Sequence, residues 1–295
     1  MAWIAESGLA SAVSNAGGLG IIAAGSAPAE YVREQIYLTR ERTARPYGVN
    51  IMLMSEHSAE IAELCARERV PVVTTGAGLP TKYMSMWLEA GVKVVPVVPS
   101  AAIAKRVERA GACAVIAEGG ESGGHVGNTT TMALVPQVCD TVSIPVIAAG
   151  GIADGRGFAA AFMLGARGVQ IGTRFLVAQE CIVHPTYKQK VLKANDTATT
   201  TTGHRLGHPI RALRTPFTRQ FQKNEADSGM SLEEVEAFGI GALRRAVQEG
   251  DEKMGSFLAG QIAGLVKREQ PAAEIIAELV AEAEQILGGA SKWVN

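Results

Sequence analysis

Short apolar runs alternate with amphipathic stretches along the first 175 residues of the chain. Runs rich in β-branched residues are typical of buried parallel strands. Seven such runs occur, at residues 19–24, 48–53, 70–75, 92–97, 112–117, 144–149 and 168–171. Helical periodicity fills the intervals, at residues 4–16, 28–41, 58–67, 80–89, 101–109, 130–140 and 155–164. This alternation predicts right-handed βαβ units and a parallel sheet.

A closed barrel of βα units contains eight strands, whereas this pattern supplies seven and opens on a helix. We therefore expect an α/β fold of the TIM type, a (β/α)8 barrel that lacks its first strand in this sequence. An open barrel would leave unpaired edges on two neighbouring strands. The expectation that follows is an active protein that starts earlier than Met1.

The rhythm of strands and helices breaks after Phe175. We expect residues 1–175 to form the barrel, and residues 176–295 to form a helical extension that covers one end of it. Helices are predicted over 183–194, from the capping-box sequence at Ser231 to about 246, over 255–267, and from Pro271 to the glycine pair at 288–289. The polar run 197–202 is predicted to be a mobile loop.

The composition is that of a tightly turned α/β enzyme, with 47% hydrophobic residues, 19% charged residues and 33 glycines in 295 residues. The net charge of −1 gives no reason to expect nucleic acid or an anionic membrane as a partner. No run reaches the roughly eighteen apolar residues of a membrane span. The first four residues lack the basic and apolar regions of a secretion signal. Together these features predict a cytoplasmic protein.

The working residues of a βα barrel lie at the carboxyl ends of its strands. Here those ends are polar and almost uncharged, with Asn50, Thr74, Thr75, Gly76, Pro99, Ser100, Glu118, Gly150, Gly151, Gln170, Gly172 and Thr173. The set contains no lysine for Schiff-base chemistry and no His/Asp cluster for a metal. Amides and backbone N–H groups suit a planar cofactor that brings its own reactivity, and flavin mononucleotide (FMN) fits that description.

Two of the apolar runs end abruptly in glycine, at Gly150–Gly151 and at Gly172. Glycine lets the backbone approach a ligand closely, and the helix that follows offers free N–H groups to an anion. A single turn of this kind more often needs glycine only for its tight geometry. Two of them in succession, late in a barrel, favour a phosphate site.

The loop after residues 112–117 is dense in glycine and presents His125. Histidine donates or accepts a proton near neutral pH. A lone loop histidine is more often an ordinary surface residue, but the position at a strand end favours catalysis here. The stretch 197–224 has no acidic residue and accumulates Arg205, Arg211, Arg214, Arg219 and Lys223, with His204 and His208 as candidates to line a substrate entrance.

Five motifs occur in an order that resembles the nitronate monooxygenase superfamily, and most of all its branch of FMN-dependent enoyl-[acyl-carrier-protein] reductases. The motifs are Gly48–Leu53, Val73–Gly78, Glu118–His125, Ile147–Gly155 and Gln170–Phe175. The resemblance covers nearly the whole chain, including His208, Arg211 and residues 259–264. The family's first strand, which ends in Gln-Gly-Gly, is absent before Met1.

The resemblance implies FMN at the barrel mouth, with its phosphate on Gly150, Gly151, Gly172 and Thr173. It places Asn50, Glu118 and Gln170 near the ring or the ribityl chain, and Thr75 and Gly124 complete the cofactor-binding set. His125 would assist protonation or hold the thioester carbonyl of a substrate, and His208, Arg205 and Arg211 would contact the substrate or its carrier.

The reaction implied is the reduction of a trans-2-enoyl thioester of acyl carrier protein or coenzyme A, with NADH or NADPH, in bacterial fatty acid synthesis. Such enzymes are typically homodimers, and some depend on a monovalent cation. Two alternatives stay open: a nitronate monooxygenase that uses oxygen, and a flavin-binding protein without turnover. The basic stretch 197–224 favours the reductase, because an acyl carrier protein is acidic and its pantetheine arm carries phosphate.

Overall fold

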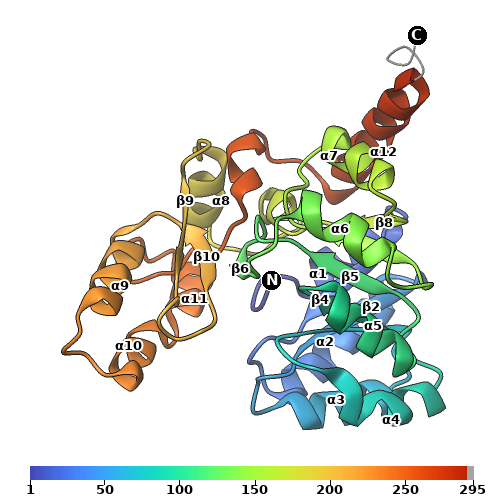
Figure 1. The fold of residues 1–295 in the computed structure, drawn as a ribbon, viewed down its shortest axis with the longest axis horizontal. Helices are drawn as coiled ribbons and strands as arrows, with labels where there is room; N and C mark the ends of the chain where they lie inside the picture. The colour runs from blue at the N-terminus through green and yellow to red at the C-terminus, as the bar shows by residue number, and fades with distance from the viewer. Residues whose placement is uncertain (291–295) are drawn as a thin grey trace.

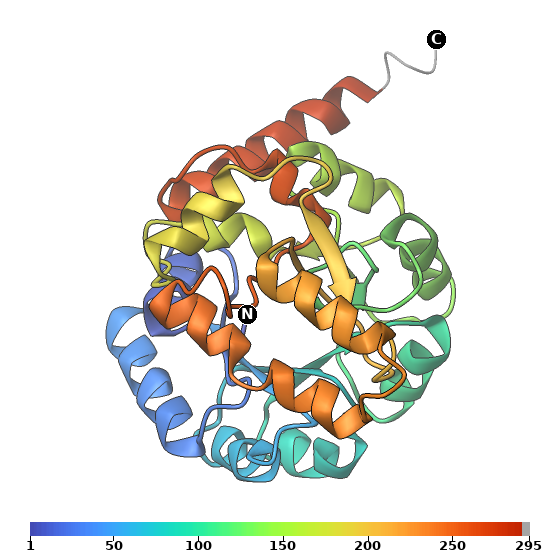
Figure 2. The same ribbon diagram turned by 90° about the vertical axis from the view of Figure 1, so that its left-hand side faces the viewer.

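A curled parallel sheet with helices on its outside dominates the computed structural model, which describes residues 1–290 (Figure 1, Figure 2). Within this range the sheet has seven strands in the order β1-β2-β3-β4-β5-β7-β8. The strands are β1 Gly20–Ala23, β2 Tyr47–Met52, β3 Val72–Gly76, β4 Lys93–Val98, β5 Val115–Glu118, β7 Val146–Ala149 and β8 Gly168–Gln170. The prediction of a TIM-type α/β fold is confirmed.

A helix precedes or follows each of these strands, as the periodicity predicts. The helices are α1 Ser7–Asn15, α2 Ala29–Arg42, α3 Ser58–Arg67, the short 3₁₀ turn η1 Pro80–Tyr83 with α4 Met84–Glu89, α5 Ala101–Arg109, α6 Thr131–Cys139 and α7 Gly155–Met163. Their ends differ from the expected ones by only a few residues. The regular alternation explains the order of the sheet, because each right-handed crossover places the next strand beside the last.

Apolar side chains cover both faces of this sheet, which explains the continuous apolar runs in the sequence. On β3 and β4, Val73 and Val94 belong to one buried cluster that includes the helix residues Ile61 and Trp87. Their strand neighbour Val72 belongs to a separate cluster on the other face. Alternate residues of one strand point to opposite faces, so few positions remain for polar groups except at the strand ends.

Parallel pairing brings the carboxyl ends of the strands to one level. Glu118 of β5 pairs with Ala149 of β7, which in turn pairs with Gln170 of β8. On the other side of the sheet, Asn50 of β2 pairs with Thr74 of β3. The polar strand-end residues therefore lie along a single rim.

The first residues of the chain lie in the mouth of the curled sheet (Figure 2). The amide of Ala23 in β1 donates to the carbonyl of Ala5 at 2.8 Å. A Cβ built on Gly172, just past β8, would lie 3.5 Å from Met1 Sδ. Strands β1 and β8 are the edges of the sheet, and no ladder joins them within residues 1–290.

A small antiparallel sheet stands over the rim. Strands β9 Thr199–Thr202 and β10 Ile210–Leu213 pair with each other, and β10 also pairs with β6 Gly124–His125. The prediction of a mobile loop at 197–202 is therefore wrong. The run is rich in threonine, a β-branched residue, and Thr202, Thr201, Thr200 and Thr199 pair with residues of β10.

Helices complete the lobe that carries this small sheet: α8 Pro185–Leu192, α9 Pro216–Ala226, α10 Leu232–Gly239, α11 Ala242–Arg244 and the π-helical turn η3 Arg245–Glu249. The capping box at Ser231 is confirmed, because its Oγ accepts from the amide of Glu234 at 3.1 Å and its own amide donates to Glu234 at 2.7 Å. The predicted helix to residue 246 instead ends at Gly239, since Gly241 takes a left-handed φ of 74°.

The predicted helix over residues 255–267 is wrong. The segment contains a β-bridge between Leu258 and Ala212, followed by a 3₁₀ turn, η4 Gln261–Leu265. The reason is close backbone packing, because a Cβ built on Gly260 would lie 2.8 Å from the carbonyl oxygen of Glu121. A regular helix with side chains all round does not fit there.

The final helix, α12 Ala272–Gly289, returns to the barrel and packs along α7 (Figure 1). The amide of Gly155, at the start of α7, donates to the carboxylate of Glu282 at 2.7 Å. Ile275 and Leu279 turn their buried side chains into the largest apolar cluster. Within the described residues, no helix is long and apolar enough to cross a membrane.

The start of β1 generates a test of this packing. A Cβ on Gly20 would overlap the backbone carbonyl of Ala10 in α1. Gly20→Ala is therefore expected to lower the free energy of unfolding by about 3 kcal/mol, because rigid backbone must move. The matched control is Gly168→Ala, since Gly168 opens β8 and nothing lies within 4 Å of its Cβ position. Urea denaturation of both variants measures the effect, and equal midpoints would contradict it.

Candidate functional site

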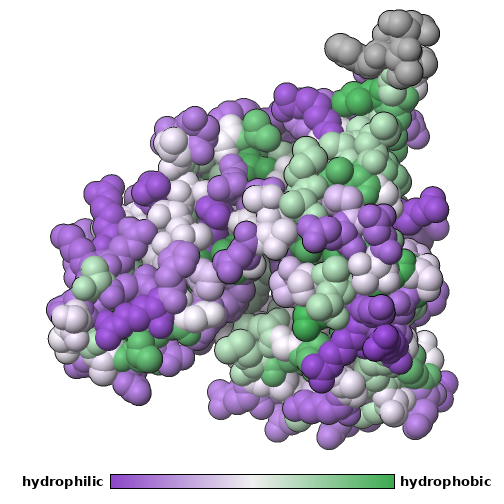
Figure 3. Space-filling model, viewed as in Figure 1, coloured by the Kyte–Doolittle hydropathy of each residue, from purple (hydrophilic) through white to green (hydrophobic). Residues whose placement is uncertain are grey.

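The candidate site lies at the rim of strand ends, beneath the antiparallel sheet of β6, β10 and β9. Figure 1 shows β6 between the barrel and the lobe that carries β9 and β10. The space-filling view shows the surface hollowed between that lobe and the barrel (Figure 3). Residues from the ends of several strands therefore face a shared recess.

The turn after β7 can be made only by glycine. Gly150 and Gly151 have φ of 88° and 75°, in the left-handed region. A Cβ on Gly150 would lie 2.8 Å from the carbonyl oxygen of Gly119 and 3.1 Å from Thr131 Oγ1. The glycine backbone is consequently held tightly against the end of β5 and the start of α6.

The turn after β8 presents a second set of polar groups. Gly172 precedes the 3₁₀ helix η2 Thr173–Val177, whose first amide groups have no acceptor within the helix. The hydroxyl oxygen of Thr173 accepts from the amide of Gly260 at 2.9 Å. Its hydroxyl hydrogen can then donate to a ligand, as the predicted phosphate contact requires.

A buried hydroxyl group at the rim lacks a partner. The Oγ1 of Thr75 on β3 makes no hydrogen bond among the described residues. Unpaired buried hydroxyls are uncommon in folded proteins. The amide nitrogen of Asn50 donates to Thr74 Oγ1 at 2.9 Å, which leaves the amide oxygen of Asn50 free for another donor. These groups fit a cofactor with carbonyls, ring nitrogens and ribityl hydroxyls, and therefore fit FMN.

Glu118, at the end of β5, titrates near neutrality. Burial raises the pKa of its carboxyl to about 7, and the nearby Ser122 hydroxyl and the amino terminus of Met1 oppose that rise. The same surroundings lower the pKa of the Met1 amino group, chiefly through burial. A carboxyl with a strongly shifted pKa at a strand end is a feature of functional sites.

Glu121 is a residue of this site that sequence reasoning missed. Its carboxylate accepts from both the amide and the hydroxyl of Thr131, each at 2.9 Å, at the start of α6. Its Oε1 also lies 3.5 Å from the Cβ position of Gly151. The carboxylate therefore braces the glycine turn, and the only sequence signal was its place within the glycine-rich loop.

His125 and His208 are brought together by strand pairing. His125 lies opposite Ile210 in the β6–β10 ladder, and the ring centroids of His125 and His208 are 6.1 Å apart. Burial by the surrounding chain lowers the pKa of His125, and His208 lowers it further. His125 is solvent-exposed, and its lowered pKa favours a neutral imidazole at neutral pH.

The two arginines predicted to contact substrate have different surroundings. The guanidinium of Arg211 donates to the carbonyl of Gly120 at 3.0 Å, which links β10 to the glycine-rich loop. Arg205 instead donates to the carbonyls of Asp227 and Met230, at 2.8 and 2.6 Å. Arg211 and His208 thus lie beside the His125 loop, whereas Arg205 is held on the connection between α9 and α10.

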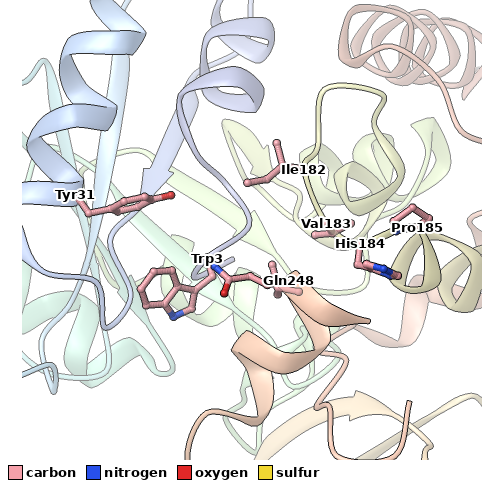
Figure 4. Close-up of a pocket in the computed structure, with 8 residues that line it drawn as sticks. Trp3, Tyr31, Ile182, Val183, His184, Pro185 and Gln248 are labelled. Carbon is pink, nitrogen blue, oxygen red and sulfur yellow. The ribbon is translucent and has the colours of Figure 1, made fainter. Parts of the chain in front are cut away.

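Two cavities open near this region, and neither is the rim itself. The first has a volume of about 370 Å³ and lies between the first residues of the chain and the start of α8 (Figure 4). The second, of about 570 Å³, lies along α8 and the end of β10, and its lining includes Lys190, Lys193, Arg214 and Glu252. Within residues 1–290, no group of three His, Cys, Asp or Glu side chains is placed to hold a metal ion.

The raised pKa of Glu118 predicts a pH dependence of stability. The folded protein binds this proton more tightly than the unfolded chain, so the stabilisation is complete below pH 4.5 and is lost as the pH rises through about 7. Glu118→Gln imitates the neutral carboxyl at every pH. In cofactor-free protein, the free energy of unfolding of the variant relative to the wild type is expected to be about 3 kcal/mol higher at pH 8 than at pH 5. Urea denaturation at both pH values measures this, and an unchanged difference would refute it.

Comparison with known proteins gives a consistent family. A protein-family model described as nitronate monooxygenase matches residues 1–68 and 62–282. Among solved structures, FabK from Thermotoga maritima superposes with a TM-score of 0.97 at 50% sequence identity, over 99% of this chain and 93% of that one.

Two curated relatives carry different names. The (3aS,4S,5R,7aS)-5-hydroxy-7a-methyl-1-oxo-octahydro-1H-indene-4-carboxyl-CoA dehydrogenase of Mycobacterium tuberculosis is 38% identical over 234 residues, which cover 78% of this chain and 66% of that protein. A probable nitronate monooxygenase of Staphylococcus aureus is 29% identical over 326 residues, which cover 95% of this chain and 91% of that protein.

Proposed function

The chain belongs to the nitronate monooxygenase family, and on that basis we propose that it is an FMN-dependent enoyl thioester reductase that uses NADH or NADPH. The observation that carries this proposal is the similarity to FabK from Thermotoga maritima, at 50% identity over 99% of the chain. That similarity favours the reductase branch over the other flavin-dependent oxidoreductases of the family.

The glycine turns would hold the FMN phosphate. Gly150 and Gly151 offer close backbone approach after β7, and Thr173 offers a hydroxyl after Gly172. Thr75, Asn50 and Gln170 would face the ring or the ribityl chain, with the Thr75 hydroxyl gaining the partner that it lacks among residues 1–290. Bound flavin supplies hydride transfer from a reduced nicotinamide to the β-carbon of an enoyl thioester.

His125 would hold the thioester carbonyl or assist protonation of the substrate. Its neutral imidazole N–H can donate to the carbonyl oxygen, where negative charge develops as the β-carbon is reduced. Burial, and to a smaller extent the neighbouring His208, lowers the pKa of His125 and so favours the neutral imidazole. Arg211 would fix the glycine-rich loop that carries His125, through its bond to Gly120.

A thioester substrate is also supported by the relatives and by charge. The Mycobacterium tuberculosis relative is named for a substrate that is a coenzyme A ester. Basic residues line the larger cavity beside β10, and only Lys190 among them bonds to Glu252, at 2.7 Å, within the described residues. Lys193 and Arg214 would attract an acidic carrier protein or the phosphates of coenzyme A. The lobe formed by residues after 176 would in this way guide the substrate to the mouth.

Nitronate monooxygenase activity is the second candidate, because the matching family model and the Staphylococcus aureus relative bear that name. The same flavin and histidine would serve, with His125 removing a proton from a nitroalkane. The two activities separate in one experiment with purified flavin-loaded protein. Oxidation of NADH or NADPH that depends on crotonyl-CoA supports the reductase, whereas oxygen uptake with propionate 3-nitronate supports the oxygenase. If neither NADH nor NADPH bleaches the flavin absorbance anaerobically, the reductase proposal is overturned.

The glycine turn after β7 gives a prediction on cofactor binding. Gly150→Ala places a Cβ 2.8 Å from the carbonyl oxygen of Gly119 in a left-handed conformation, so the turn must open. The variant is expected to lose at least nine-tenths of its flavin per mole of protein. The control is Gly168→Ala, at the first residue of β8 and away from the strand ends of the rim, and this variant should keep its flavin. Absorbance at the flavin band measures both, with circular dichroism to confirm folding; a yellow Gly150→Ala protein would remove this turn from the cofactor site.

His125 gives a prediction on turnover. His125→Ala is expected to retain flavin and to lose about 100- to 10,000-fold in kcat for enoyl thioester reduction, the usual range for a positioned acid. The matched control is His57→Ala, because His57 precedes α3 and is not among the residues of the proposed site. Steady-state kinetics with crotonyl-CoA measure both variants. Unchanged turnover in His125→Ala would exclude the residue from the mechanism.

A further inference from the structure

The smaller cavity has an apolar lining drawn from four separate segments. Figure 4 shows Trp3 and Tyr31 on one side, with Ile182, Val183 and Pro185 on the other. The volume of about 370 Å³ is within the range of small-molecule sites, and a mainly apolar wall with few polar groups is typical of them. No carboxylate or ammonium group lines it.

Two of its polar lining groups are occupied. His184 Nδ1 accepts from the amide of Thr186 at 3.2 Å, and Gln248 Oε1 accepts from Arg244 Nε at 2.8 Å. The guanidinium of Arg244 lies over the Trp3 ring, at 5.1 Å from its centroid. A nicotinamide or a pantetheine arm carries several amide and hydroxyl groups, for which this wall offers few polar partners. Its mainly apolar lining therefore favours a hydrocarbon ligand.

Two further observations mark the wall as a ligand site. Ile182 is 59% exposed beside the buried Val183, so apolar surface is left uncovered at the opening. Trp3 has a φ of 62°, a left-handed conformation that is uncommon for residues other than glycine. Such conformations persist where surrounding structure enforces them, and they cluster at ligand clamps.

The cavity adjoins the mouth of the barrel. Trp3 is two residues from Met1, whose Sδ lies 3.5 Å from the Cβ position of Gly172. The amino group of Met1 is also close enough to the Glu118 carboxyl, at the end of β5, for their charges to interact. A substrate with its reacting carbons in the mouth can thus extend its tail past Trp3.

We infer that this cavity receives the alkyl chain of the enoyl thioester, and that Trp3, Tyr31 and Ile182 set the chain length that the enzyme accepts. The inference rests on the proposed function and assigns it a substrate class: medium-chain thioesters are preferred over crotonyl thioester. The Mycobacterium tuberculosis relative is named for a bulky bicyclic acyl group on coenzyme A, which agrees with a subsite larger than a crotonyl group needs.

Chain length gives the test in the flavin-loaded enzyme. Each methylene that enters the cavity should raise kcat/KM by about fourfold, so trans-2-octenoyl-CoA should exceed crotonyl-CoA by more than tenfold. Ile182→Trp narrows the opening without disturbing the core, because Ile182 is 59% exposed. The variant is expected to lose at least tenfold in kcat/KM for octenoyl-CoA and less than twofold for crotonyl-CoA.

The control is Ile240→Trp, an equally bulky change at a residue that is 70% exposed on the lobe and does not line the cavity. It should leave both substrates unaffected. An equal loss on both substrates in Ile182→Trp, or no preference for octenoyl-CoA in the wild type, would overturn the inference.

Calorimetric binding of the saturated products separates this inference from the proposed function. Octanoyl-CoA should bind the holoenzyme at least tenfold more tightly than butyryl-CoA, and Ile182→Trp should abolish that difference. Absence of crotonyl-CoA reduction together with this binding pattern would refute the reductase and keep the subsite. Reduction of crotonyl-CoA with equal binding of the two products would refute the subsite and keep the reductase.

Discussion

The register of the parallel sheet is the constraint on which the rest of the structure depends. Because Glu118, Ala149 and Gln170 stand at one level on three adjacent strands, the turns that follow them meet at one rim. A slip of one residue in any pairing would turn the polar strand ends into the apolar layers of the sheet. The glycine turns, the paired histidines and the braced carboxylate of Glu121 all take their positions from this alignment.

The barrel could be predicted from the sequence because most of its strands are buried on both faces and its helices pack against their neighbours in the chain. Val72 and Val73 show the reason: both are buried, on opposite faces, so the run is apolar throughout. The lobe was harder, because its pairings join distant segments. Threonines 199–202 look like a polar loop until β10 supplies their partners, and residues 255–267 have helical periodicity that the packing at Gly260 forbids.

The candidate site divides in the same way. The turn at Gly150 and Gly151 could be predicted from the local sequence, because a left-handed turn at a strand end favours glycine. The position of His125 does not follow from its own loop, since it is fixed by pairing with β10 across a long stretch of chain. Glu121 escaped notice for a related reason: its partner Thr131 becomes visible only once α6 has closed over the turn.

The β6–β10 ladder places His125 and the proposed cofactor site on two separate parts of the fold. The glycine turns that we propose to hold the cofactor phosphate belong to the barrel, whereas His125 is paired with β10, a strand that the later part of the chain provides. Loss of the β6–β10 pairing would displace the His125 imidazole and leave the proposed cofactor site intact, so the protein would bind flavin without turning over substrate. Because the two parts are separate, the lobe that carries β9 and β10 can change in evolution to suit new substrates while the glycine turns of the barrel stay the same.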